Sequence, residues 1–157
     1  MKNSVCFIGH RKTVETEKLK LQLKAVIEAL ITTENVNIFF FGSRSRFNDL
    51  CYELVTEMKK KFPHIKRVYV RAEYPNIDES YEEYFLEKYE YTYYPRKILN
   101  SGKAVYTHRN YEMIDKSCFC VIYFDKCLAA KTRKSGTELA YNYALKNNRH
   151  IIKLPFD

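Results

Sequence analysis

Short apolar runs alternate along this chain with longer segments in which apolar residues recur at helical spacing. The apolar runs, which predict buried strands, are residues 5–8, 36–41, 65–70, 118–124 and 150–154. The segments with helical spacing are residues 12–33, 49–62, 80–91, 104–115 and 135–145. Strands alternating with helices indicate an α/β fold, a three-layer sandwich with a mainly parallel sheet of about five strands.

The chain of 157 residues shows no internal repeat and no linker, so we predict a single domain over residues 1–157. No stretch approaches the roughly 18 apolar residues that a membrane span needs, and the N-terminus lacks the pattern of a signal peptide. We therefore expect a cytoplasmic protein with no membrane partner. The formal net charge of +8 favours anionic partners such as nucleotides or nucleic acid.

Five cysteines occur without the paired spacing of a zinc site. Cys6, Cys118 and Cys120 lie in apolar, strand-like runs, which favours buried reduced thiols over a disulfide. We expect no bound metal and no cofactor.

Polar residues follow the ends of several predicted strands. Gly9, His10 and Arg11 come directly after the first strand, and residues 42–49 form a polar loop after the second. Parallel sheets bind ligands at the carboxyl ends of their strands. Serine hydroxyls and guanidinium groups before a helix start also suit an anion.

The segment 74–94 is rich in tyrosine and acidic residues. Its tyrosines could stack on a base or sugar, pack a sheet edge, or form a dimer contact. The sequence leaves these three options open, and with them the question of a homo-oligomer.

Four motifs in order carry a family resemblance: residues 7–11, the loop from Gly42 to residues 48–49, residues 109–117, and residues 135–137 before residues 143–144. Together they resemble the SLOG superfamily, and most closely its YpsA-like branch of small single-domain proteins. The resemblance spans nearly the whole chain. It implies a Rossmann-like fold and a nucleotide-derivative site at the carboxyl ends of the strands. The superfamily also contains the Lonely Guy phosphoribohydrolases and the DNA-processing protein family.

The ligand-binding residues predicted from the loops and the resemblance together are Gly9, His10, Arg11, Gly42, Ser43, Arg44, Arg46, Asn48, Arg109, Ser135, Gly136 and Thr137. Relatives commonly have a glycine where this chain has Arg46, and another where it has Ser135. Fewer glycines leave less room for the backbone to approach a phosphate, so side chains are expected to replace those contacts.

Two of these residues, and Glu138, have alternative roles. His10 could bind phosphate, fix its own loop, or act as a general acid or base. Arg109 is interpreted as an anion ligand, although it could instead pair with Glu112 one turn later. Glu138 stands near a predicted helix start, where glutamate is the nucleophile of related nucleotide N-glycosidases; it could equally just complement the helix dipole.

Three functions follow as hypotheses. The first is binding of a small nucleotide derivative, either ADP-ribose-like or a cyclic nucleotide signal, in a crevice at the carboxyl edge of the sheet. The second makes the protein an enzyme, a phosphoribohydrolase-like nucleotide N-glycosidase with Glu138 as the catalytic residue. The third is charge-driven binding of single-stranded nucleic acid, which is not favoured because the basic residues are spread through the chain.

Overall fold

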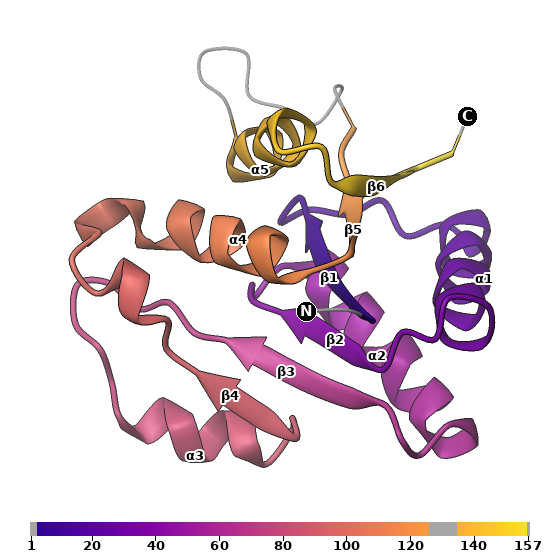
Figure 1. Ribbon diagram of the computed structural model, residues 1–157, viewed down its shortest axis with the longest axis horizontal. Coiled ribbons are helices and arrows are strands. Elements are labelled where there is room, and N and C mark those ends of the chain that lie inside the picture. The colour runs from indigo at the N-terminus through magenta and orange to yellow at the C-terminus, as the bar shows by residue number, and fades with distance from the viewer. Residues whose placement is uncertain (1–2, 126–134, 157) are drawn as a thin grey trace.

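The computed structural model describes residues 3–125 and 135–156, and within these ranges the chain forms one parallel sheet of six strands flanked by helices (Figure 1). The strands are β1 (Ser4–Gly9), β2 (Ile38–Phe41), β3 (Lys66–Val70), β4 (Tyr91–Tyr93), β5 (Phe119–Tyr123) and β6 (His150–Leu154). The helices are α1 (Glu17–Thr32), α2 (Arg46–Lys61), α3 (Ser80–Leu86), α4 (Val105–Lys116) and α5 (Gly136–Lys146), with short 3-10 helices η1 (Arg96–Ile98) and η2 (Gly102–Ala104). The strand order β4-β3-β2-β1-β5-β6 confirms the predicted Rossmann-like α/β architecture.

The sheet has one strand more than the sequence predicts, because the tyrosine-rich segment contains β4. The helix expected over residues 80–91 ends at Leu86. Residues 91–93 pair instead with β3, with Val68 opposite Tyr91 and Val70 opposite Tyr93. This pairing makes β4 an edge strand, so one of the three options for the tyrosines, packing at a sheet edge, is met by these residues.

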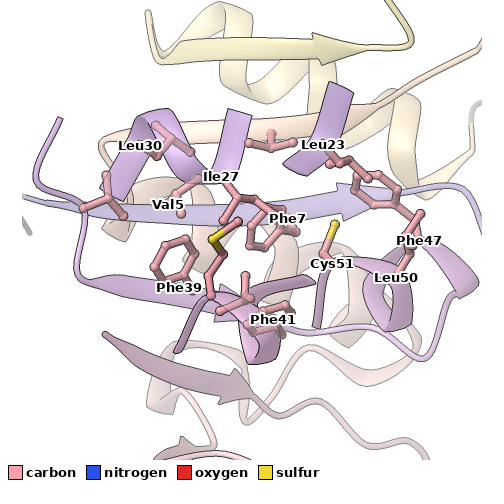
Figure 2. Close-up of a cluster of buried hydrophobic side chains, with 14 of the residues drawn as sticks. Val5, Phe7, Leu23, Ile27, Leu30, Phe39, Phe41, Phe47, Leu50 and Cys51 are labelled. Atoms are coloured by element: carbon pink, nitrogen blue, oxygen red, sulfur yellow. The ribbon is translucent and has the colours of Figure 1, made fainter. Parts of the chain in front are cut away.

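Alternate residues of the strands point to opposite faces of the sheet, and each face has its own core. Phe7, Phe39 and Phe41 are fully buried on the face covered by α1, α2 and α3 (Figure 2). The other face carries Cys6 and Ile8 under α4 and α5. Helices on both faces bury most of the central strands β1, β2 and β5, which explains the near-continuous apolar sequences of these three strands.

Three helices begin at a hydroxyl side chain that accepts a hydrogen bond from the backbone three residues later. The bonds run from the Leu19 nitrogen to Thr16 Oγ1, from the Asn48 nitrogen to Ser45 Oγ and from the Glu138 nitrogen to Ser135 Oγ, at 3.0, 3.1 and 3.0 Å. Each satisfies a donor that the first helical turn leaves unpaired. In chain order, these three helices come next after β1, β2 and β5.

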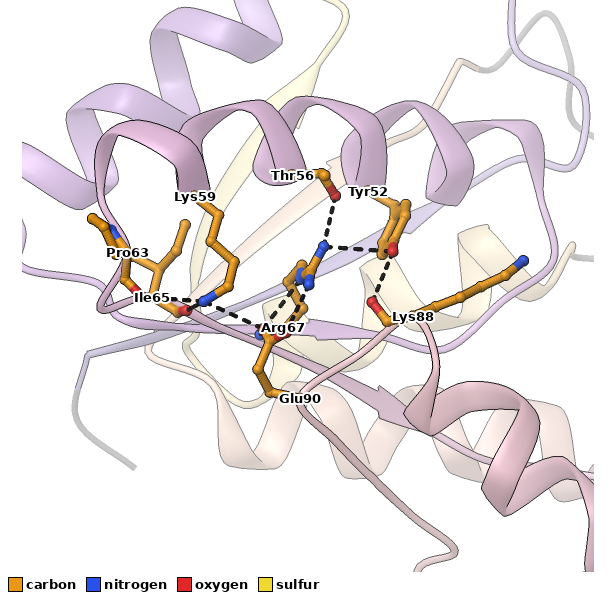
Figure 3. Close-up of polar contacts among 8 residues, drawn as sticks. All are labelled: Tyr52, Thr56, Lys59, Pro63, Ile65, Arg67, Lys88 and Glu90. Atoms are coloured by element: carbon orange, nitrogen blue, oxygen red, sulfur yellow. Dashed lines mark hydrogen bonds and ion pairs between the residues drawn. The ribbon is translucent and has the colours of Figure 1, made fainter.

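A polar network at the other end of β3 ties α2 to β3 and β4 (Figure 3). The Arg67 guanidinium donates to both Glu90 carboxylate oxygens, at 3.1 and 2.6 Å, and to Thr56 at 2.9 Å. Lys59 adds an ion pair to Glu90 at 3.8 Å. These contacts fix the position of the short edge strand.

Cys6, Cys51 and Cys120 are buried free thiols, which confirms the prediction for Cys6 and Cys120, whereas Cys118 is only half-buried. Cys127 lies outside the described residues. Among the described residues, no helix combines the length and apolar character that crossing a membrane requires.

Candidate functional site

The strand order reverses direction at β1. From β1 the chain moves outward through β2, β3 and β4, then returns to place β5 on the other side of β1. The helices after β1 and β5 pack on opposite faces, α1 on one and α5 on the other. In open parallel sheets, ligands bind beside the carboxyl ends of the strands at such a reversal of strand order.

His10, directly after β1, contacts the residues directly after β5. Its ring is only 7% exposed and lies edge-on to Tyr123 and Phe124, with centroid distances of 5.8 Å to each. Nε2 accepts a hydrogen bond from the Asp125 backbone nitrogen at 2.9 Å. Because an acceptor nitrogen carries no proton, the neutral imidazole holds its proton on Nδ1. The observed contact supports the loop-fixing role among those considered for His10.

Burial lowers the pKa of His10 from its ordinary value of 6.5, although the neighbouring Asp125 opposes this shift. Because the pKa of His10 is lower in the folded state than in the unfolded state, its contribution to stability is fully present above the unfolded-state pKa. This contribution is lost as the pH falls below that value and through the folded-state pKa. The His10→Gln variant keeps an acceptor for the Asp125 N–H but does not titrate. Wild type is expected to lose more stability than this variant between about pH 7 and about pH 5, measured by urea unfolding. Equal losses in the two proteins would exclude a coupling between His10 protonation and the loops.

The loop after β2 is held by Asn48, which is 3% exposed. Its Oδ1 accepts from the backbone nitrogens of Gly42 and Ser43 at 3.3 and 3.4 Å. The Ser43 and Ser45 hydroxyls lie 2.8 Å apart and bond to one another. Because the backbone N–H groups of Gly42 and Ser43 already donate to Asn48, an anion at this loop would be held by side chains. The scarcity of glycine in the loop leads to the same expectation.

Gly42 is required because the side chain of Arg109 crosses above it. A Cβ atom at Gly42 would lie 2.6 Å from Arg109 Cδ and 2.8 Å from the Met113 sulfur, both on α4. Arg109 is 5% exposed. It therefore reaches from the α4 face of the sheet across the end of β2.

No carboxylate of the described residues pairs with the Arg109 guanidinium. Its Nε donates to Asn110 Oδ1 at 3.1 Å, and its Cζ lies 5.9 Å from the Tyr106 ring centroid. Within residues 3–125 and 135–156, no ion pair to Arg109 is formed; Glu112 pairs with Lys116 at 3.5 Å instead. Burial lowers the pKa of Arg109, because the charged form is poorly solvated there. A buried cation without a counter-ion is the electrostatic feature of an anion site.

Arg44 brings a second guanidinium to the same region. Its Cζ lies 4.9 Å from the Tyr81 ring centroid, and contacts with Tyr81 and Tyr69 raise its pKa. Burial raises the pKa of Tyr69, whereas the charges of Arg109 and Arg44 both act to lower it. Both cations thus lie close enough to the Tyr69 hydroxyl to influence its charge.

Arg71 is a residue of this edge that the sequence reasoning missed. It directly follows β3, is 6% exposed, and pairs with Glu73 through bonds of 3.0 and 2.8 Å. A further bond to the Asp78 carbonyl at 2.9 Å holds the loop before α3. Its charge is already neutralised, so Arg71 shapes the edge while Arg109 is left to meet an anion.

The remaining residues of the first two loops serve packing or surface contacts. Gly9 lies against Phe47, since a Cβ there would approach the ring to 2.4 Å. Arg11 is exposed, and its carbonyl accepts from the Arg46 nitrogen at 3.2 Å, which joins the two loops. The Arg46 guanidinium makes a surface ion pair with Glu15, with both bonds at 2.7 Å.

The start of α5 contributes the third group of predicted residues. Ser135 acts as the helix cap, Thr137 is buried, and open space surrounds the Gly136 position. Glu138 is half-buried, and its backbone nitrogen is the one that Ser135 caps. The cap explains these residues as a helix start, and the assignment of Glu138 as a nucleophile stays a prediction.

The described part of the chain holds no group of three or more His, Cys, Asp or Glu side chains arranged for a metal ion. No protein-family model matches the chain. No curated protein matches it either. The SLOG resemblance therefore stays a prediction, and the argument for function has to come from the site itself.

Proposed function

We propose that this protein binds a small nucleotide derivative, ADP-ribose-like or a cyclic nucleotide, at the carboxyl edge of its sheet. The observation that carries the proposal is Arg109, a buried guanidinium across the end of β2 with no carboxylate partner among the described residues. A phosphate would supply the missing negative charge, and the planar guanidinium fork matches its oxygens.

The surroundings of Arg109 suit the rest of such a ligand. Arg44 offers a second cation, and the rings of Tyr81 and Tyr106 offer flat surfaces for a base or sugar. The reversal of strand order at β1 opens loops toward the same edge. The net charge of +8 would speed the approach of an anion.

Isothermal titration calorimetry with ADP-ribose, cyclic AMP and AMP tests this proposal. At least one of them is expected to bind wild type, and Arg109→Met is expected to weaken that binding about 30-fold. Because an unpaired buried charge opposes folding, the variant should unfold at a temperature no lower than wild type does. Loss of affinity without loss of stability would separate a binding role from a structural one.

The matched control is Lys24→Met, which removes the same charge from an exposed position on α1. It should retain wild-type affinity. If none of the three compounds binds wild type, or if Arg109→Met binds as tightly as wild type, the proposal is wrong.

A further inference from the structure

A groove separate from Arg109 lies beside the edge strand β4. It is lined by residues 93–97, which lead from β4 into η1, together with Glu112 and Lys116 of α4. Its volume of about 370 Å³ falls within the range of small-molecule sites. The groove lies at the side of the sheet, because β4 is the edge strand there and has no strand beyond it among the described residues.

Glu112 lines this groove, and one of its two carboxylate oxygens has no donor among the described residues. The residue is 5% exposed, and its Oε2 accepts from the Tyr93 hydroxyl at 3.0 Å and pairs with Lys116 Nζ at 3.5 Å. Its Oε1 is buried and has no hydrogen-bond partner among the described residues. A buried carboxylate oxygen without a donor is rare and unfavourable, so this atom indicates that a donor is missing.

The outer part of the groove carries the opposite charge. Arg96 and Lys97 are exposed, and the Lys116 side chain is 45% exposed. Lys116 Nζ also lies 5.1 Å from the Tyr93 ring centroid. One carboxylate among three cations does not suit a metal ion. It suits a molecule with N–H donors at one end and an anionic group at the other.

We propose that this groove is a second ligand site, for a nucleoside monophosphate bound with its base inward. The base donates an N–H to Glu112 Oε1, which becomes accessible when the flexible Lys116 side chain moves aside. The phosphate meets Arg96 and Lys97, and the base lies against the ring of Tyr94 and neighbouring Pro95. An acidic amino acid shares the combination of donor and anion, but it offers no planar face to these walls.

Titration of ¹⁵N-labelled protein with GMP tests the proposal, since guanine presents two adjacent N–H donors. GMP is expected to shift the amide resonances of residues 93, 94, 96, 97 and 112–116; residue 95 is proline and has no amide proton. Ribose 5-phosphate, which has the anion but no base, should bind there at least about tenfold more weakly. Glu112→Gln should weaken GMP binding about tenfold, because a neutral amide oxygen is a weaker acceptor than a charged carboxylate oxygen.

A double variant with Arg96→Ala and Lys97→Ala provides a second test, because both side chains are exposed and their removal leaves the core intact. It too should weaken GMP binding about tenfold. Equal affinity for GMP and ribose 5-phosphate, tighter binding of aspartate than of GMP, or no shifts at residues 93–97 would each overturn the proposal. Shifts confined to residues 9–11 and 42–44 would also overturn it while supporting the site at Arg109, so the two proposals can fail separately.

Discussion

Replacing Phe7 with alanine is expected to destabilise the protein by about 4 kcal/mol. Phe7 is 1% exposed and stacks on Phe41 and Phe39, with ring centroids 5.2 and 6.1 Å away (Figure 2). Its loss leaves a cavity between the central strands and α1 that rigid strands cannot close. The midpoint of thermal unfolding should fall by about 10 °C or more.

The matched control for Phe7→Ala is Leu21→Ala, because Leu21 lies on α1 with its side chain 67% exposed. It should change stability by less than about 0.5 kcal/mol. Comparable losses in the two variants, measured by urea unfolding, would contradict the assignment of the central core to this face of the sheet.

The second large effect is expected at Arg67, whose side chain is 12% exposed and pairs with Glu90, which is 20% exposed. Arg67→Met would remove the guanidinium from the partly buried Glu90 carboxylate, which would keep the bond from the backbone nitrogen of residue 67 at 2.8 Å and the ion pair with Lys59 at 3.8 Å. Breaking such a pair is expected to cost about 3 kcal/mol. Burial alone would raise the pKa of Glu90, but the bonds from Arg67 outweigh burial and lower this pKa. The pair therefore stabilises the fold fully above the ordinary pKa of glutamate, and this stabilisation is lost as the pH falls below that value.

Arg46→Met tests the same chemistry at the surface. Arg46 also makes a two-bond ion pair, with Glu15, but its side chain is 40% exposed and that of Glu15 is 27% exposed. Solvent screens this pair, so its removal should cost about 0.5 kcal/mol. If Arg46→Met and Arg67→Met lose equal stability, burial is not what makes the Arg67 network important.

The central strands could be predicted because their sequences satisfy a local rule. β1, β2 and β5 are covered on both faces, and this requires a continuous apolar run that periodicity detects. The helix start near Ser135 also follows from local chemistry, whereas α2 begins at Arg46, three residues before the predicted start, with Ser45 as its cap. The carboxyl-edge location of residues 9–11 and 42–44 then follows from the parallel order of the strands.

Features that depend on distant partners could not be predicted. β4 is three residues long with Tyr91 exposed, and it is a strand only because β3 lies beside it. The bond from the Tyr93 hydroxyl to Glu112 Oε2 joins residues 19 positions apart, which is beyond the reach of local rules. Arg71 could have been predicted as a residue of the carboxyl edge, since it directly follows a predicted strand. Its pairing with Glu73 could not have been predicted.

A structure of the protein with bound ADP-ribose tests the central claim most directly, because it locates the phosphates relative to Arg109. We predict a phosphate oxygen within about 3 Å of an Arg109 guanidinium nitrogen, above Gly42 and close to Arg44. A ligand bound elsewhere, with the Arg109 guanidinium still bonded only to Asn110, would contradict the claim that this buried cation is a phosphate-binding residue.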